Sequence, residues 1–145
     1  MNRKMKVILI LIVAIVIWHF FRFILAYIKL RNEISAKGGP KVICDILING
    51  LLNSYSSARV IQDKKMFVTI GGTFTDPIFK RECGRWSFII QPAFMLNLKY
   101  RAYTDLGGGE VAKQMWDFPI DMNQEEILAV IKEKADQWDI YGIYK

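Results

Sequence analysis

Histidine is almost absent from this chain, since its 145 residues contain only His19. Ser-His-Asp and Cys-His catalysis both need a histidine beside the nucleophile, and the usual zinc sites need several histidine and cysteine ligands. His19 lies inside a long apolar segment, and the two cysteines, Cys44 and Cys83, lie beyond it. The sequence therefore predicts neither a metal nor a cofactor, and it disfavours an enzyme.

Phosphate-binding motifs are lacking as well. The longest run of glycines, Gly107-Gly108-Gly109, has neither the Gly-Lys-Ser/Thr sequence of a P-loop nor the G-x-G-x-x-G spacing of a dinucleotide site. Three glycines after a strand are better explained by a turn that requires positive φ. The acidic residues, which can act in pairs without histidine, are dispersed over predicted turns. We therefore expect a non-catalytic protein.

Most of the chain also lacks an excess of either charge. The net charge is +6, but residues 1–37 account for all of it, with seven basic side chains and one acidic one. Residues 38–145 carry 13 basic and 13 acidic side chains. A balanced domain does not present the basic surface that nucleic acids require. We exclude a nucleic-acid partner and expect the positive charge to meet anionic lipid headgroups.

One long apolar run is present near the N-terminus. Residues 7–28 are apolar except for His19 and Arg22, and as a helix they would span about 33 Å, the thickness of a bilayer's hydrocarbon core. The run is too long for a cleaved signal peptide and ends in bulky residues where cleavage needs small ones. The sequence predicts a transmembrane anchor over residues 1–32, in contact with the lipid bilayer and flanked by basic residues.

Two ionisable residues interrupt the anchor. His19 and Arg22 are three residues apart and therefore share one face of a helix. They are candidates for a polar contact inside the membrane with a neighbouring helix. Alternatively, Arg22 reaches the headgroups with its long side chain, and the residues after Phe21 lie in the interface.

Basic residues flank both sides of the anchor in nearly equal number, so the positive-inside rule does not fix its orientation. A short N-terminal tail before an apolar run is typical of a signal-anchor with the tail in the cytoplasm. We expect a bacterial inner-membrane protein with its domain outside the cytoplasm.

Cys44 and Cys83 could form a disulfide outside the cytoplasm, whereas on the cytoplasmic side they would be buried thiols. Cys44 lies among apolar residues, where a thiol is inert.

The rest of the chain divides into a hinge linker, residues 33–41, and a soluble domain, residues 42–145. Apolar spacing predicts a helix over 41–55, with a buried strand over 42–48 as the alternative. Strands are expected at 66–70, 86–90, 94–104 and 111–118, with a turn or bulge at Gly71-Gly72. Asn123 is the expected N-cap of a last helix, whose buried stripe contains Ile127, Ile131, Ala135 and Trp138.

This order predicts an α+β fold, in which an antiparallel meander of three or four strands packs against two helices in two layers. The aromatic C-terminal end, with Trp138, Tyr141 and Tyr144, is the predicted surface for a protein partner, because such residues dominate binding hot spots.

The layout, rather than any motif, is similar to that of small single-pass bacterial proteins of the cell envelope. These include immunity proteins against toxins and accessory subunits of secretion or respiratory complexes. That resemblance implies a membrane-anchored binding protein. A tethered module that binds lipid or another small ligand is the alternative, and it would need a deep apolar cavity between sheet and helices.

Overall fold

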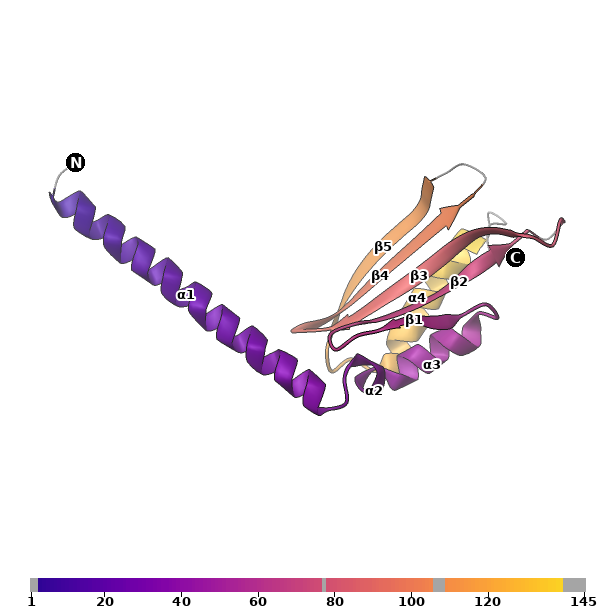
Figure 1. Cartoon of the computed structure of the whole chain (residues 1–145), viewed down its shortest axis with the longest axis horizontal. Coiled ribbons are helices and arrows are strands. Elements are labelled where there is room, and N and C mark those ends of the chain that lie inside the picture. The colour runs from indigo at the N-terminus through magenta and orange to yellow at the C-terminus, as the bar shows by residue number, and fades with distance from the viewer. Residues whose placement is uncertain (1–2, 77, 106–108, 140–145) are drawn as a thin grey trace. The chain divides into compact units, whose positions relative to one another are not determined.

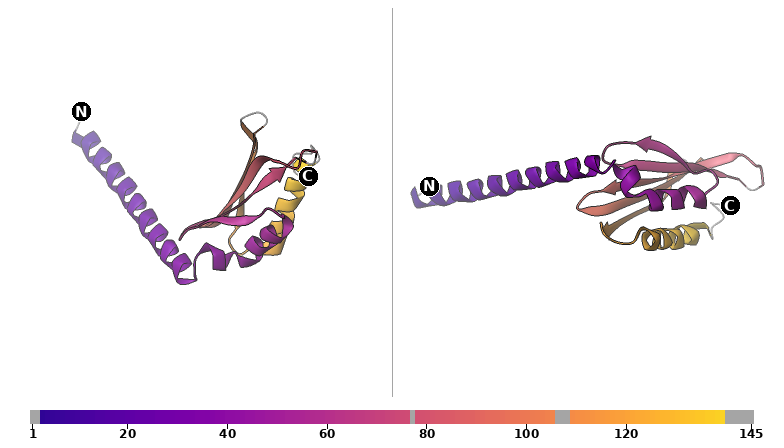
Figure 2. Two further views of the ribbon diagram at one scale, coloured as in Figure 1. Left: turned by 45° about the vertical axis from the view of Figure 1, so that its right-hand side comes forward. Right: turned by 90° about the horizontal axis from the view of Figure 1, so that it is seen from below.

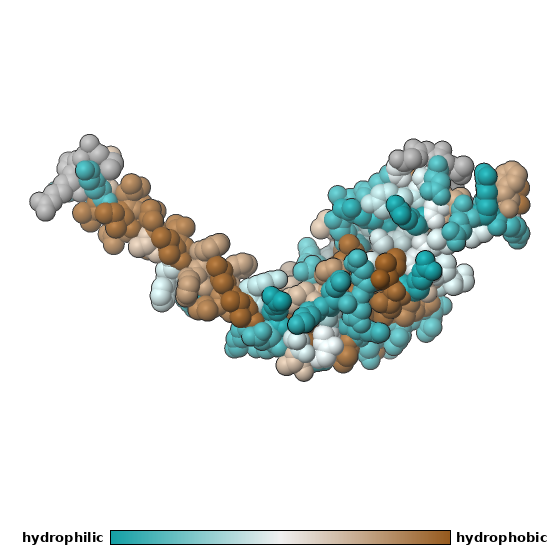
Figure 3. Space-filling view, viewed as in Figure 1, coloured by the Kyte–Doolittle hydropathy of each residue, from teal (hydrophilic) through white to brown (hydrophobic). Residues whose placement is uncertain are grey.

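The computed structural model describes residues 3–76, 78–105 and 109–139, with residues 3 and 136–139 described as backbone only. The chain divides into two units, Met1–Glu33 and Ile34–Lys145. Helix α1, Arg3–Ala36, accounts for the first unit. It is long and apolar enough to cross a membrane, and Figure 3 shows its surface as almost continuously hydrophobic. This is compatible with the predicted single span or signal-anchor.

The hinge contains two glycines in the left-handed region of backbone conformation. Gly38 has φ 92° and Gly39 has φ 83°, values that other residues adopt only with strain. The Gly39 N–H donates to the Ile34 carbonyl at 2.9 Å, so the end of α1 is capped by the turn itself. Pro40 then opens a short helix, α2, Pro40–Ile43, at the position where its missing N–H costs nothing.

The predicted helix over 41–55 is two helices. Cys44, at φ −109° and ψ 31°, separates α2 from α3, Asp45–Ser54. The alternative of a buried strand over 42–48 is wrong, because α3 uses a helical spacing to bury Leu47, Ile48 and Leu51. The break at Cys44 lets α3 take its own direction along the sheet.

A five-stranded antiparallel sheet forms the second layer, with its strands in the order β1-β2-β3-β4-β5. The strands are β1 Arg59–Asp63, β2 Val68–Thr75, β3 Glu82–Pro92, β4 Met95–Thr104 and β5 Gly109–Pro119. The α+β meander is as predicted, but the count of three or four strands is wrong. Sequence reasoning missed β1, because this short edge strand is irregular between Val60 and Gln62 and so lacks a clean alternation.

Gly71 and Gly72 do not form the predicted turn or bulge. They lie in the middle of β2, paired with Ser87 and Trp86 of β3. A Cβ on Gly71 would come within 2.3 Å of Ile61 Cδ1, and one on Gly72 within 2.4 Å of Ser57 Oγ. Glycine is therefore required here by close approach on both faces of the strand rather than by a turn.

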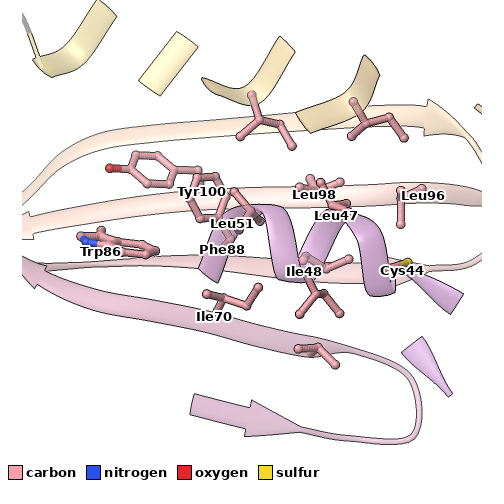
Figure 4. Close-up of a cluster of buried hydrophobic side chains, with 14 of the residues drawn as sticks. Cys44, Leu47, Ile48, Leu51, Ile70, Trp86, Phe88, Leu96, Leu98 and Tyr100 are labelled. Carbon is pink, nitrogen blue, oxygen red and sulfur yellow. The ribbon is translucent and has the colours of Figure 1, made fainter. Parts of the chain in front are cut away.

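The helices α3 and α4, Gln124–Asp139, lie side by side on one face of the sheet (Figures 1 and 2). The predicted alternation of β4 is confirmed, since Leu96, Leu98, Tyr100 and Ala102 are buried. Figure 4 shows side chains of α3 pointing at those of the central strands. The core cluster includes the residues labelled there: Cys44, Leu47, Ile48, Leu51, Ile70, Trp86, Phe88, Leu96, Leu98 and Tyr100.

The N-cap of α4 is also confirmed. The Asn123 side-chain oxygen Oδ1 accepts a hydrogen bond of 2.9 Å from the Glu125 N–H. The predicted stripe of Ile127, Ile131 and Ala135 is buried.

Candidate functional site

The residues that the sequence nominated for partner binding lie at the limit of the structure. The backbone of Trp138 belongs to α4, whereas Tyr141 and Tyr144 lie outside the described residues. His19 and Arg22 are exposed on α1, in the first unit of the chain. The partner surface at the C-terminal end and the intramembrane contact of His19 and Arg22 both stay predictions.

A different surface emerges from the register of the sheet. The face opposite α3 and α4 carries the side chains that alternate with the core, and its central row crosses all five strands. In order from β1 to β5, this row consists of Arg59, Gly71, Ser87, Arg101 and Lys113. It therefore has one cation at the β1 end, two cations at the β5 end, and the small residues Gly71 and Ser87 between them. We call this side of the sheet the open face.

A groove of about 790 Å³ runs along the open face over β1, β2 and β3. Its lining includes Thr69, Thr73 and Ser87, whose small side chains leave open space above the middle of the sheet. Arg59 and Ile61 of the edge strand β1 and Arg85 of β3 also line it. The groove is mixed in character, because it offers hydroxyl, aliphatic and guanidinium groups together.

Arg85 and its neighbours form a connected polar cluster on the open face. The Arg85 guanidinium carbon lies 5.8 Å from the centre of the Tyr103 ring. The Tyr103 hydroxyl donates to Glu110 Oε2 at 3.2 Å, and Arg101 Nη1 donates to the Tyr103 oxygen at 3.3 Å. Arg101 Nε also lies 3.7 Å from Glu110 Oε2. These contacts hold two arginines in place beside the groove.

No family model matches this chain, and neither a curated protein nor a solved structure matches it significantly. The domain also has a second exposed feature, in the hairpin between β2 and β3.

The hairpin between β2 and β3 projects two apolar side chains. Ile78 is 79% exposed and Phe79 is 67% exposed, and an apolar patch covers this tip in Figure 3. Asp76 Oδ1 accepts hydrogen bonds from the N–H groups of both residues, at 2.7 and 2.9 Å. These two bonds lower the pKa of Asp76. These bonds tie the backbone of Ile78 and Phe79 to the Asp76 side chain.

Chemistry at the two cysteines is limited by burial. Cys44 lies in the core, where desolvation, assisted by the nearby charge of Asp45, raises its pKa to about 11. The inertness expected of Cys44 is therefore supported. Cys83 is half-buried, and its thiol donates to the Phe74 carbonyl at 3.7 Å. Both thiols are free in the structure.

Among the described residues, no three His, Cys, Asp or Glu side chains are grouped as metal ligands.

Large apolar side chains occupy the space between sheet and helices. Leu47, Leu51, Phe88 and Tyr100 meet there and are almost completely buried. A lipid-binding module would have to hold its ligand in this same space. The small polar positions of the open face could have been noticed in the sequence, because Thr69, Gly71 and Thr73 alternate with core residues in one strand.

Proposed function

We propose that this chain is a non-catalytic, single-pass membrane-anchored protein whose domain binds a protein partner at the membrane surface. The observation that carries this proposal is the open face, where a groove of about 790 Å³ lies beside fixed arginine and tyrosine side chains. Arginine, tyrosine and exposed apolar side chains are the groups enriched in protein interfaces. Ile78 and Phe79, exposed in the hairpin between β2 and β3, offer further apolar contacts.

The biological role that suits this arrangement is that of an immunity or inhibitor protein against a toxin, or of an accessory subunit of an envelope complex. An anchor confines the domain to the membrane and raises its effective concentration for partners there. We place the protein in a bacterial inner membrane with the domain outside the cytoplasm. A tethered lipid or small-ligand module is the alternative, and it would have to hold its ligand between sheet and helices, where large buried side chains lie.

Two measurements test the anchoring. Full-length protein should stay with the membrane fraction after an alkaline carbonate wash, and its release would refute integral anchoring. For orientation, Ser56 is exposed and offers a labelling position as Ser56→Cys in a Cys83→Ala background. We expect an impermeant thiol reagent to label intact cells. Labelling only after lysis would place the domain in the cytoplasm.

The partner itself is tested by affinity purification of the full-length protein from detergent-solubilised membranes. We expect one stoichiometric partner, and recovery should fall about tenfold with Arg85→Glu, because this reverses a charge fixed beside the groove. Lys132→Glu is the matched control, since it reverses an exposed charge on α4, which lies on the helical face. Purification without a partner would refute the binding function.

The same assay compares the two candidate surfaces. If Arg85→Glu has no effect while Trp138→Ala with Tyr141→Ala abolishes recovery, the partner binds the C-terminal end and the open face is the wrong surface. If the reverse is found, the prediction for Trp138, Tyr141 and Tyr144 is wrong.

A further inference from the structure

The end of the domain that follows the hinge carries exposed apolar side chains that the proposed partner surface does not use. Five large apolar residues there are between 43% and 59% exposed. We call this surface the hinge-end rim, and it consists of Val42, Ile46, Phe94, Met95 and Ile120. Hydrophobic groups gathered in this way at one end of a small domain indicate a surface that is covered by something else.

Pairing and hydrogen bonds place these residues at one end of the domain. Met95 pairs with Pro119, so the turn between β3 and β4 lies beside Ile120. Gln124, at the start of α4, bonds to Ile43 and Leu47 and so holds α2 and the first turn of α3 beside it. Figure 1 shows α2, the β3–β4 turn and the β5–α4 connection at the same end, opposite the β2–β3 hairpin.

The hinge lies directly beside the rim. A Cβ on Gly38 would come within 2.9 Å of Val42 Cγ2, so the rim begins against the hinge itself. Between the end of the apolar run at Ile28 and the start of α2 at Pro40 there are eight helical residues and three others. At about 1.5 Å per helical residue and at most about 3.5 Å per extended residue, this connection spans roughly 22 Å. If α1 crosses a bilayer, the hinge end cannot be far from its headgroups.

The charges around the rim nearly cancel. Lys64 and Lys65 are exposed in the turn between β1 and β2, at the same end of the sheet. Lys41 Nζ lies 3.8 Å from Asp63 Oδ2, so this ion pair offsets the negative charge of Asp63. Asp45 and Asp121 are also near, so the charge of this end is close to balanced. The apolar side chains, rather than net charge, must therefore supply most of the attraction.

We propose that the hinge-end rim is a second membrane contact, with its apolar side chains in the interfacial region of the bilayer that α1 crosses. The proposal rests on the anchoring part of the proposed function and not on the partner. An exposed apolar side chain gains free energy by leaving water for this region, and the tether removes most of the cost of association. Such a contact restricts the orientation of the domain on the membrane.

The test uses the full-length chain reconstituted into vesicles of phosphatidylcholine with a minor share of phosphatidylglycerol. Phe94→Cys and Phe79→Cys, each in a Cys83→Ala background, carry the same environment-sensitive fluorophore. The two positions are matched, because both are exposed phenylalanines, one at the rim and one at the opposite hairpin. Lipids with a nitroxide near the headgroup should quench the label at position 94 several-fold more strongly than the label at position 79.

Equal quenching at the two positions, or weaker quenching at position 94, would overturn the proposal. A second pair of variants separates insertion from mere proximity to the tether. Met95→Ser with Ile120→Ser should reduce the quenching at position 94, whereas Ile61→Ser with Met115→Ser, on the open face, should not. Quenching that survives loss of Met95 and Ile120 would also refute the rim as a lipid contact.

Flotation of the vesicles at alkaline pH tests the bilayer anchor separately from the rim contact. Protein that does not float has no bilayer anchor, which refutes the anchoring and the rim together. Protein that floats but is not quenched at position 94 refutes the rim alone. In that case, the label at position 94 is also tested with a soluble quencher in native membranes. Protection there, without protection in the vesicles, would mean that a protein rather than lipid covers the rim.

Discussion

Gln124 caps a helix that lies 77 residues earlier in the chain: its side-chain Oε1 accepts a hydrogen bond of 3.0 Å from the backbone N–H of Leu47. Its Nε2 donates to the Ile43 carbonyl at 2.7 Å. Cys44, the N-cap residue of α3, makes no side-chain capping bond. Gln124 therefore satisfies one of the free N–H groups at the start of α3 and one free carbonyl of α2, and it joins α4 to both.

Gln124→Ala should destabilise the domain. Loss of the side chain leaves two partly buried backbone groups unpaired, and we expect the free energy of unfolding to fall by about 1–2 kcal/mol. Thermal unfolding of the full-length protein in detergent, followed by near-UV circular dichroism, measures the change. Gln91→Ala is the control, because Gln91 is a half-buried glutamine on the open face. Equal effects of the two substitutions would contradict the capping role.

Gly72→Ala should also destabilise the domain, because the new Cβ would lie 2.4 Å from Ser57 Oγ and 2.9 Å from the Ser57 carbonyl oxygen. Ser57 Oγ in turn bonds to the backbone of Thr73, so it cannot move without cost. We expect a loss of roughly 1–3 kcal/mol, as for overpacking elsewhere. Gly109→Ala is the matched control, since no atom lies within 4 Å of its Cβ position. A Gly72→Ala domain as stable as the Gly109→Ala domain would show that β2 tolerates a side chain there.

Cys44 should make stability depend on pH in the alkaline range. Burial raises its pKa to about 11 in the folded domain, so the unfolded chain loses this proton at a lower pH than the folded one. Stability from this group is then fully present below about pH 9 and falls as the pH rises toward 11, by up to about 2 kcal/mol.

Urea unfolding at a series of pH values measures this slope, and comparison with Cys44→Ala isolates the cysteine from other groups that titrate there. The slope of the wild-type protein should be steeper than that of the variant. Parallel slopes would mean that the Cys44 thiol is not desolvated. In the native protein, alkylation should reach the half-buried Cys83 before Cys44.

Residues 38–145 should fold without the anchor. The connected core cluster runs from Cys44 to Ile131 and contains no residue of α1. Ile34, near the end of α1, is also buried, but it lies outside this cluster. We expect a soluble fragment to unfold cooperatively with heat, with the same near-UV spectrum as the domain in the full-length protein. A fragment without a cooperative transition would mean that the membrane or a partner completes the core.

Local patterns in the sequence were enough to predict the long apolar helix α1, the α+β class, the long strand β4 and the helix α4. The helices and β4 each keep one regular spacing of apolar residues along ten residues or more, and α4 also has a capping residue at its start. Residues close together in the chain therefore decide these structures. The alternation of β4 and the Asn123 cap belong to this group. The buried, unreactive position of Cys44 also followed from its apolar neighbours.

Tertiary structure alone decided β1, the place of Gly71-Gly72 and the candidate site. Strand β1 is defined by its pairing with β2, and the two glycines are required by contacts with Ile61 and Ser57. The open face needs the register of all five strands, because its central row gathers Arg59, Ser87 and Lys113 from separate parts of the chain. Such contacts depend on which strands meet, and sequence neighbours carry little information about that.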